Sequence, residues 1–466
     1  MRHRVLLTVL LVFVLMPYSA VVAAEPDPAL QAAEAVYWQD GAEAALPLFS
    51  ELVERFATAG DKSNEALARH FVGACYRRLG DFEQARQHLN TALASRRTIG
   101  DDLGIAKTTN LLGLLEWDLG NYEQAISQFQ STEEVGKSIG DPKIEGAALN
   151  NLSLVYDELG DYKTSLSQYE RVLAIYADAE FPRGEGDTHG NIGGVYLLLG
   201  QFRKALSSYE QALAISIELD SSMAMSQDHG NIGLAYLGLG DIDVAIDHFD
   251  KAIELAAAAG MRQDVAYWQG AKANALVSKG RFDAGIALYR KALSTYEEIE
   301  ARGELLAALH DMGQLHLSLG DPASAESYFE RAISLARDIG NANGILVNML
   351  ALGDLHLRRD QLDAAAGYYN QARQRANQLE SQALLVEALL GLAYVHQRQQ
   401  RFDEVSEELD IALAISRTIE ARQQEAEALF VLAENERGKE NARQALRFFA
   451  AAESILEAVS YTHLRA

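Results

Sequence analysis

The sequence has few of the features that point to chemistry or to a β fold. It contains one cysteine, Cys75, so no intramolecular disulfide can form, and the apolar pattern around it predicts a buried, inert thiol. Sustained period-two alternation with hairpin dipeptides is absent, which argues against strands. There is no glycine-rich phosphate loop, no paired-cysteine motif and no His-Glu-x-x-His motif. We therefore expect a helical protein that is not an enzyme and that uses no cofactor and no metal.

Basic residues are scarce relative to acidic ones. The chain has 41 Lys and Arg residues against 66 Asp and Glu, which gives a net charge of −25. Such a field repels nucleic acid and anionic membranes and favours basic or neutral partners. Hydrophobic residues make up 48% of the chain, which is enough for a continuous core.

What the chain does have is a repeat. A small residue recurs every 40 positions without a single insertion, and self-similarity at one fixed period is typical of stacked-repeat architectures. A second small column and a bulky column, such as Ala205 and Tyr209, keep the same register, and facing helices interdigitate in this way. The first column consists of Ala33, Gly73, Gly113, Ser153, Gly193, Gly233, Ala273, Gly313, Gly353, Ala393 and Ala433.

Each period contains two helical patterns separated by a turn. Within residues 146–179, apolar residues at helical spacing stop at Gly160-Asp161 and then resume. Gly160 suits a left-handed helix end, and Asp161 can cap the next helix. The sequence therefore predicts an all-α solenoid of about eleven helix-turn-helix repeats over residues 25–459.

These columns resemble the tetratricopeptide repeat, which residues 191–212 illustrate best. There Ile192-Gly193, Tyr196, Leu199-Gly200, Phe202, Ala205, Tyr209 and Ala212 occupy the family's positions. The period is 40 rather than the common 34, and the proline after the second helix is missing, so the second helix is longer. This extended form is similar to the arrays of kinesin light chains and to those that precede CHAT domains in bacterial proteins. The resemblance implies a right-handed superhelix whose concave groove is lined mainly by first helices and binds a peptide or protein without chemistry.

The two ends of the chain depart from the repeat. Residues 1–24 combine a short basic region, an apolar run and a small-residue cleavage site, which together predict a secretory signal peptide and export to the periplasm or the medium. The alternative is an uncleaved membrane anchor. Residues 460–466 fit no column and resemble a translated sequencing adapter, in which case the natural chain continues beyond the array; the alternative is a short natural tail.

Histidines recur in one column. His316, His356 and His396 stand where earlier repeats have tyrosine, and such a ladder could suggest a metal or a pH sensor. Equivalent residues of successive repeats lie on the order of 10 Å apart, which is too far to share a zinc ion. The same objection applies to His189 and His229. We therefore expect these side chains to pack between helices.

Asparagines form a better candidate binding site. Asn151, Asn191 and Asn231 share one column of the first helices, which by the family resemblance faces the groove. An amide is both donor and acceptor and can hold an extended peptide backbone without reading its sequence. The alternative is that these side chains bond to neighbouring helices or only to water. The apolar pockets beside them are expected from Leu197, Leu234 and Leu237.

Three functions are compatible with these observations. The first is an exported scaffold that binds a protein or peptide in its groove. The second is the sensor half of a truncated protein that carries a CHAT-type cysteine protease domain after the array. The third is a structural spacer or self-assembly unit, which would need no distinctive groove column.

Overall fold

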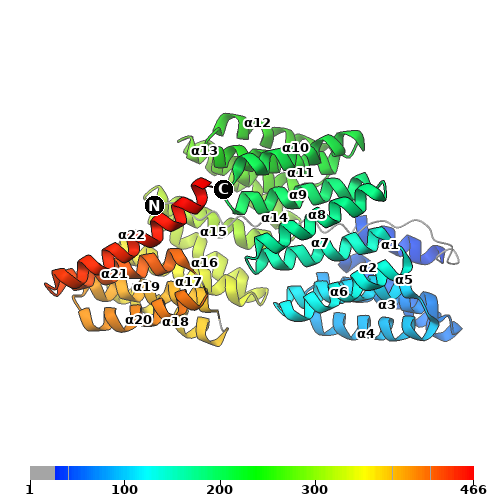
Figure 1. Ribbon diagram of the computed structural model, residues 1–466, viewed down its shortest axis with the longest axis horizontal. Helices are drawn as coiled ribbons and strands as arrows, with labels where there is room; N and C mark the ends of the chain where they lie inside the picture. Colours follow the sequence, from blue (N-terminus) through cyan, green and yellow to red (C-terminus); the bar gives the residue numbers. More distant parts are fainter. Residues whose placement is uncertain (1–26, 40, 380, 420, 466) are drawn as a thin grey trace. The chain divides into compact units, whose positions relative to one another are not determined.

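The computed structural model describes residues 27–39, 41–379, 381–419 and 421–465, and the predicted signal peptide lies outside them. Within these ranges the chain forms 22 α-helices and no strand (Figure 1). In chain order they are α1 (Pro28–Gln39), α2 (Ala42–Ala59), α3 (Lys62–Arg78), α4 (Phe82–Ile99), α5 (Asp102–Asp118), α6 (Tyr122–Ile139), α7 (Pro142–Glu158), α8 (Tyr162–Asp178), α9 (Pro182–Leu198), α10 (Phe202–Glu218), α11 (Ser222–Leu239), α12 (Ile242–Ala258), α13 (Arg262–Ser278), α14 (Phe282–Glu298), α15 (Arg302–Ser318), α16 (Pro322–Asp338), α17 (Ala342–Arg358), α18 (Leu362–Gln378), α19 (Gln382–Arg398), α20 (Phe402–Thr418), α21 (Arg422–Gly438) and α22 (Ala442–Arg465).

The helices form eleven pairs, so the predicted all-α helical-repeat solenoid is confirmed. The odd-numbered helix of each pair is its first helix and the even-numbered one its second. The backbone of α22 runs through most of residues 460–466, the segment that fits no repeat column.

The turns follow the predicted chemistry. Gly160 has φ 76°, in the left-handed region, and the side chain of Asp161 accepts a hydrogen bond from the backbone N–H of Thr164 at 3.1 Å. A positive φ recurs every 20 residues at every described turn from residue 60 onward, so turns within and between repeats have the same form. At six of these turns the residue is not glycine: Glu180, Asp220, Glu300, Asp360, Gln400 and Glu440.

The small and bulky columns pack on each other as expected. A Cβ atom added to Gly193 would lie 2.5 Å from Cε1 of Tyr209, and one added to Gly113 would lie 2.6 Å from Cε1 of Phe129. Contacts this short leave no room for a methyl group. At these two positions glycine lets an aromatic ring from the second helix lie directly against the first.

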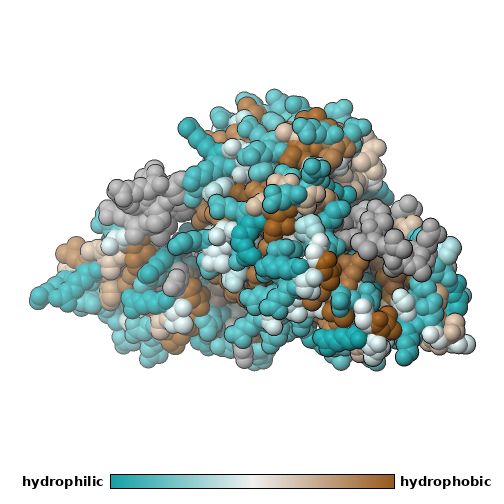
Figure 2. Space-filling model, turned by 45° about the vertical axis from the view of Figure 1, so that its right-hand side comes forward, coloured by the Kyte–Doolittle hydropathy of each residue, from teal (hydrophilic) through white to brown (hydrophobic). Residues whose placement is uncertain are grey.

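The chain divides into two compact units, each with its own apolar core. The N-terminal unit comprises residues up to 198 together with 202–232, and the C-terminal unit comprises 199–201 and residues from 233 onward. Buried side chains such as Phe49 and Phe129 fill the first core, and Tyr369 and Leu392 belong to the second. The face shown in Figure 2 is largely hydrophilic, with scattered apolar patches.

Within each unit the first helices form the inner side of the stack. In the N-terminal unit the first helices from α1 to α9 contact one another in sequence, and in the C-terminal unit those from α15 to α21 do the same. Among the described residues, successive second helices do not approach each other in this way. We call the surface formed by the first helices of a unit its inner surface.

Candidate peptide-binding surface

Two of the three predicted asparagines join neighbouring first helices. Nδ2 of Asn151 on α7 donates to Oδ1 of Asn110 on α5 at 3.0 Å, and Nδ2 of Asn191 on α9 donates to Oδ1 of Asn150 on α7 at the same distance. We call such a position, where two first helices face each other across 41 residues of sequence, a rung. The remaining amide atoms of these four side chains are not buried without a partner, so they are available to solvent or to a ligand.

The third asparagine has no such partner. Asn231 on α11 is half-buried, and the residue 41 positions earlier is Gly190, which has no side chain to pair with it. A Cβ at Gly190 would meet nothing within 4 Å, so there is open space beside the helix. Asn231 forms no hydrogen bond with any residue in the described part of the chain.

The three predicted leucines contribute to the packing of their own repeats. Leu197 is buried, and Leu234 and Leu237 are partly buried against a cluster that includes Phe249 and Trp268. Whether any of them also contacts a peptide stays a prediction.

The asparagine column continues in the C-terminal unit as a carboxylate that the sequence reasoning missed. Asp311 on α15 occupies the same position of the 40-residue period as Asn231, two repeats further on. Burial raises its pKa to about 7, against an ordinary value of 3.8. Following the column by position rather than by residue type would have found it.

The surroundings of Asp311 are polar. Burial raises the pKa of the phenols of Tyr267 on α13 and of Tyr289 and Tyr296 on α14, and the charge of Asp311 raises each of them further. The hydroxyl of Tyr289 donates to Oδ1 of Asn274 at 2.6 Å. Asp311 itself forms no hydrogen bond or ion pair with a residue that the structure describes.

The histidine column belongs to aromatic pairs between the two helices of a repeat. His316 stacks on Tyr328 with ring centroids 5.4 Å apart, and His356 stacks on Tyr368 at 5.2 Å. In two earlier repeats the order is reversed, because tyrosine stands on the first helix and histidine on the second: Tyr76 with His88, and Tyr236 with His248. An exchange that preserves the pair indicates a packing role.

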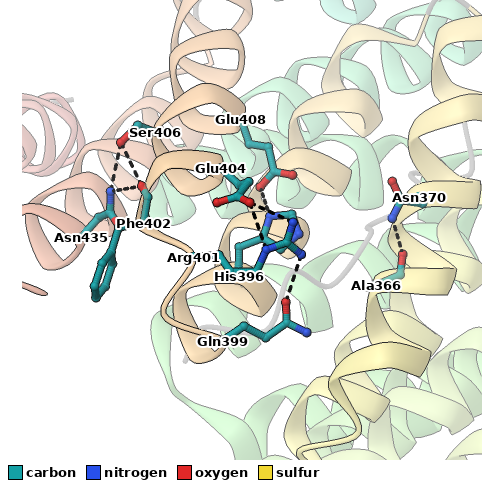
Figure 3. Close-up of polar contacts among 10 residues, drawn as sticks. All are labelled: Ala366, Asn370, His396, Gln399, Arg401, Phe402, Glu404, Ser406, Glu408 and Asn435. Atoms are coloured by element: carbon teal, nitrogen blue, oxygen red, sulfur yellow. Dashed lines mark hydrogen bonds and ion pairs between the residues drawn. The ribbon is translucent and has the colours of Figure 1, made fainter. Parts of the chain in front are cut away.

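His396 is the exception in this column (Figure 3). Its Nδ1 lies 3.0 Å from Oε2 of Glu408, and an ion pair between Arg401 and Glu404 lies beside them. Burial lowers the pKa of His396 and raises that of Glu408 to about 7, so burial disfavours the charged form of both groups. In the described residues no group of three His, Cys, Asp or Glu side chains is placed to hold a metal ion.

A stack of helix pairs with a polar inner surface defines a helical-repeat scaffold protein. The sequence pattern of the tetratricopeptide repeat matches residues 28–98, 104–178, 185–258 and 264–338, and a second pattern of the same name matches residues 310–378. The chain therefore belongs to the tetratricopeptide repeat family, whose fold is typical of protein–protein interaction scaffolds. Among proteins with curated descriptions, none matches the chain significantly.

Solved structures agree with this assignment. A Rap protein complexed with competence and sporulation factor is 14% identical with a TM-score of 0.50, and the alignment covers 86% of this chain and 99% of that one. The apo form of RapI is 15% identical with a TM-score of 0.51, covering 76% and 98%. A signal-transduction ATPase with a tetratricopeptide repeat sensor from Pyrococcus horikoshii is 13% identical with a TM-score of 0.52, covering 73% and 54%. At these identities the likeness concerns the fold.

Within the part of the chain that the structure describes, no helix is both long enough and apolar enough to cross a bilayer.

Proposed function

We propose that the protein is an exported scaffold that binds an extended peptide segment of a partner protein along the inner surface of its first helices. The observation that supports this best is the row of amides on α5, α7, α9 and α11, whose atoms are not all used within the protein. An amide offers a donor and an acceptor together, which matches the alternating groups of a peptide backbone. Export rests on residues 1–24 of the sequence.

The charge of the chain restricts the chemical class of its partner. A net charge of −25 disfavours nucleic acid and anionic lipid and favours a basic or neutral protein. A second copy of the chain is a further candidate partner, because stacked repeats can associate end to end.

The sharpest test of the binding surface is Asn231→Ala. Because Asn231 has no partner in the described chain, its removal breaks no contact between helices, and alanine is the better helix former. We expect stability to hold or rise slightly. Binding to a partner recovered with the wild-type protein from a periplasmic extract should weaken roughly two- to tenfold, as expected for one net hydrogen bond.

Asn151→Ala is the matched control, because it removes the same side chain but also breaks the bond to Asn110. Its stability should fall by about 0.5–1.5 kcal/mol. Wild-type affinity in the Asn231 variant would show that this amide is only solvated surface. A wild-type chain that recovers no partner would favour the spacer.

A further inference from the structure

The rungs of the inner surface are of two kinds. At Asn151–Asn110 and Asn191–Asn150 two amides close the space between neighbouring first helices. In the C-terminal unit the residue 41 positions before Asp311 is Gly270, so this rung is open.

There is room for a side chain beside Gly270. A Cβ there would meet only Cε1 of Tyr289, at 3.8 Å, which is ordinary van der Waals contact. Over their whole length, α13 and α15 contact each other less than α15 and α17 do. A glycine in the middle of a helix costs roughly 0.5–1 kcal/mol relative to alanine, and here no close backbone contact requires it. The glycine keeps open a site that an amide closes elsewhere in the chain.

The carboxyl group at this opening lacks a partner. Asp311 forms no hydrogen bond or ion pair in the described chain, although burial raises its pKa. Native structures leave few buried polar groups unpaired, and each such group calls for a ligand, a water or a function.

Resting on the proposed function, we propose that the open rung formed by Asp311 and Gly270 receives the cationic side chain, lysine or arginine, of a peptide bound along the inner surface of the C-terminal unit.

Local charge favours a cation over other ligands. The ionised groups that act on Tyr296, beside this site, are Glu304, Asp264 and Asp311, and all three are acidic. No basic side chain neutralises Asp311 within the described residues. The charge of Asp311 acts on the phenols of Tyr267 and Tyr289, and Tyr289 is hydrogen-bonded to Asn274, so these side chains would supply the oxygen acceptors around an ammonium or guanidinium group.

The test uses the full chain and synthetic peptides. Bead-bound hexapeptides carry Lys, Arg, norleucine or Glu at one position and Ala, Ser, Thr or Val elsewhere. The best lysine peptide and its norleucine analogue are then titrated by fluorescence anisotropy. The wild-type protein should prefer lysine about ten- to hundredfold, the range expected for a hydrogen bond to a charged group.

Two variants remove the preference in different ways. Asp311→Asn deletes the charge, and Gly270→Asn supplies the amide that closes the equivalent rungs. In both, the ratio of lysine to norleucine affinity should fall close to one. Gly367→Asn is the matched control, because Gly367 lies exposed on the second helix α18 with open space around it. Its ratio should stay at the wild-type value, and circular dichroism checks that all three variants fold.

The outcomes separate the two proposals. If peptides bind but show no preference for lysine or arginine, or if the preference survives in both variants, the cation site is refuted and peptide binding stands. If no hexapeptide binds at all, peptide binding along this surface is refuted, and the cation site with it.

Discussion

Replacing Asp311 with asparagine should stabilise the protein at neutral pH and leave it unchanged in acid. The carboxyl group has a pKa of about 7 in the folded chain and an ordinary value of 3.8, because burial disfavours its charged form. Below about pH 4 the group is protonated in both the folded and the unfolded chain, so it costs nothing. Between pH 4 and 7 only the folded chain keeps the proton, so stability falls as pH rises, and above pH 7 the full cost is present.

The size of the effect follows from the two pKa values. At about 1.4 kcal/mol for each pH unit between them, the cost above pH 7 is at most about 4 kcal/mol. Asp311 is half-buried, and water near the carboxylate reduces this figure, so we expect the asparagine variant to gain about 1–3 kcal/mol at pH 8. Asparagine has nearly the same shape and keeps an oxygen acceptor, so packing should not change.

The assay is urea unfolding followed by circular dichroism at pH 4, 6 and 8 for wild type and variant. Other buried carboxyl groups titrate alike in both proteins and cancel in the difference. Asp410→Asn, at an exposed position on α20, serves as the control and should change stability little at any pH. A gain for the Asp311 variant that is the same at pH 4 and pH 8, or a loss at pH 8, would refute the reasoning, because the carboxylate would then be paired or solvated.

Three further predictions concern the scaffold. Glu300→Gly should raise the melting temperature, because Glu300 has φ 53° and a left-handed backbone costs a residue with a side chain about 1–2 kcal/mol, partly offset by the flexibility of glycine; a lower melting temperature contradicts this. Gly193→Leu should destabilise by roughly 1–3 kcal/mol or more, since even a methyl group would meet the ring of Tyr209; an unchanged thermal melt would show that the ring moves freely. A peptide of residues 186–225 should show no cooperative melt by circular dichroism, whereas three consecutive repeats should be helical and melt cooperatively.

The sequence predicts the helices well because the same residue pattern recurs in each successive unit of 40 residues. Gly160, Asp161 and Gly193 each have a local reason for their position, and the structure confirms those reasons. The partners of the asparagines were not predictable in this way. Asn151 bonds to Asn110 because of the stagger between neighbouring first helices. The repeat period of 40 residues does not predict that positions 41 residues apart will meet.

Asp311 was missed for a related reason. A search for a repeated residue type finds the asparagines, but a site can also be made by a change of type at a constant position. Here Asp311 stands 41 residues after Gly270, whereas the closed rungs have asparagine at both positions. The structure connects the two through Tyr289, whose ring lies beside Gly270 and whose phenol is acted on by the charge of Asp311.

The uniform turns have a consequence for how such a chain can change its length. Because a left-handed residue recurs at a spacing of 20 at the described turns from residue 60 onward, the backbone does not distinguish a turn inside a repeat from a turn between repeats. Loss of 20 residues would join helices smoothly, yet it would exchange inner and outer helices from that point on and press ring against ring. Loss of 40 would keep each ring opposite a small residue. The backbone alone would permit growth by single helices, but the side chains restrict it to pairs.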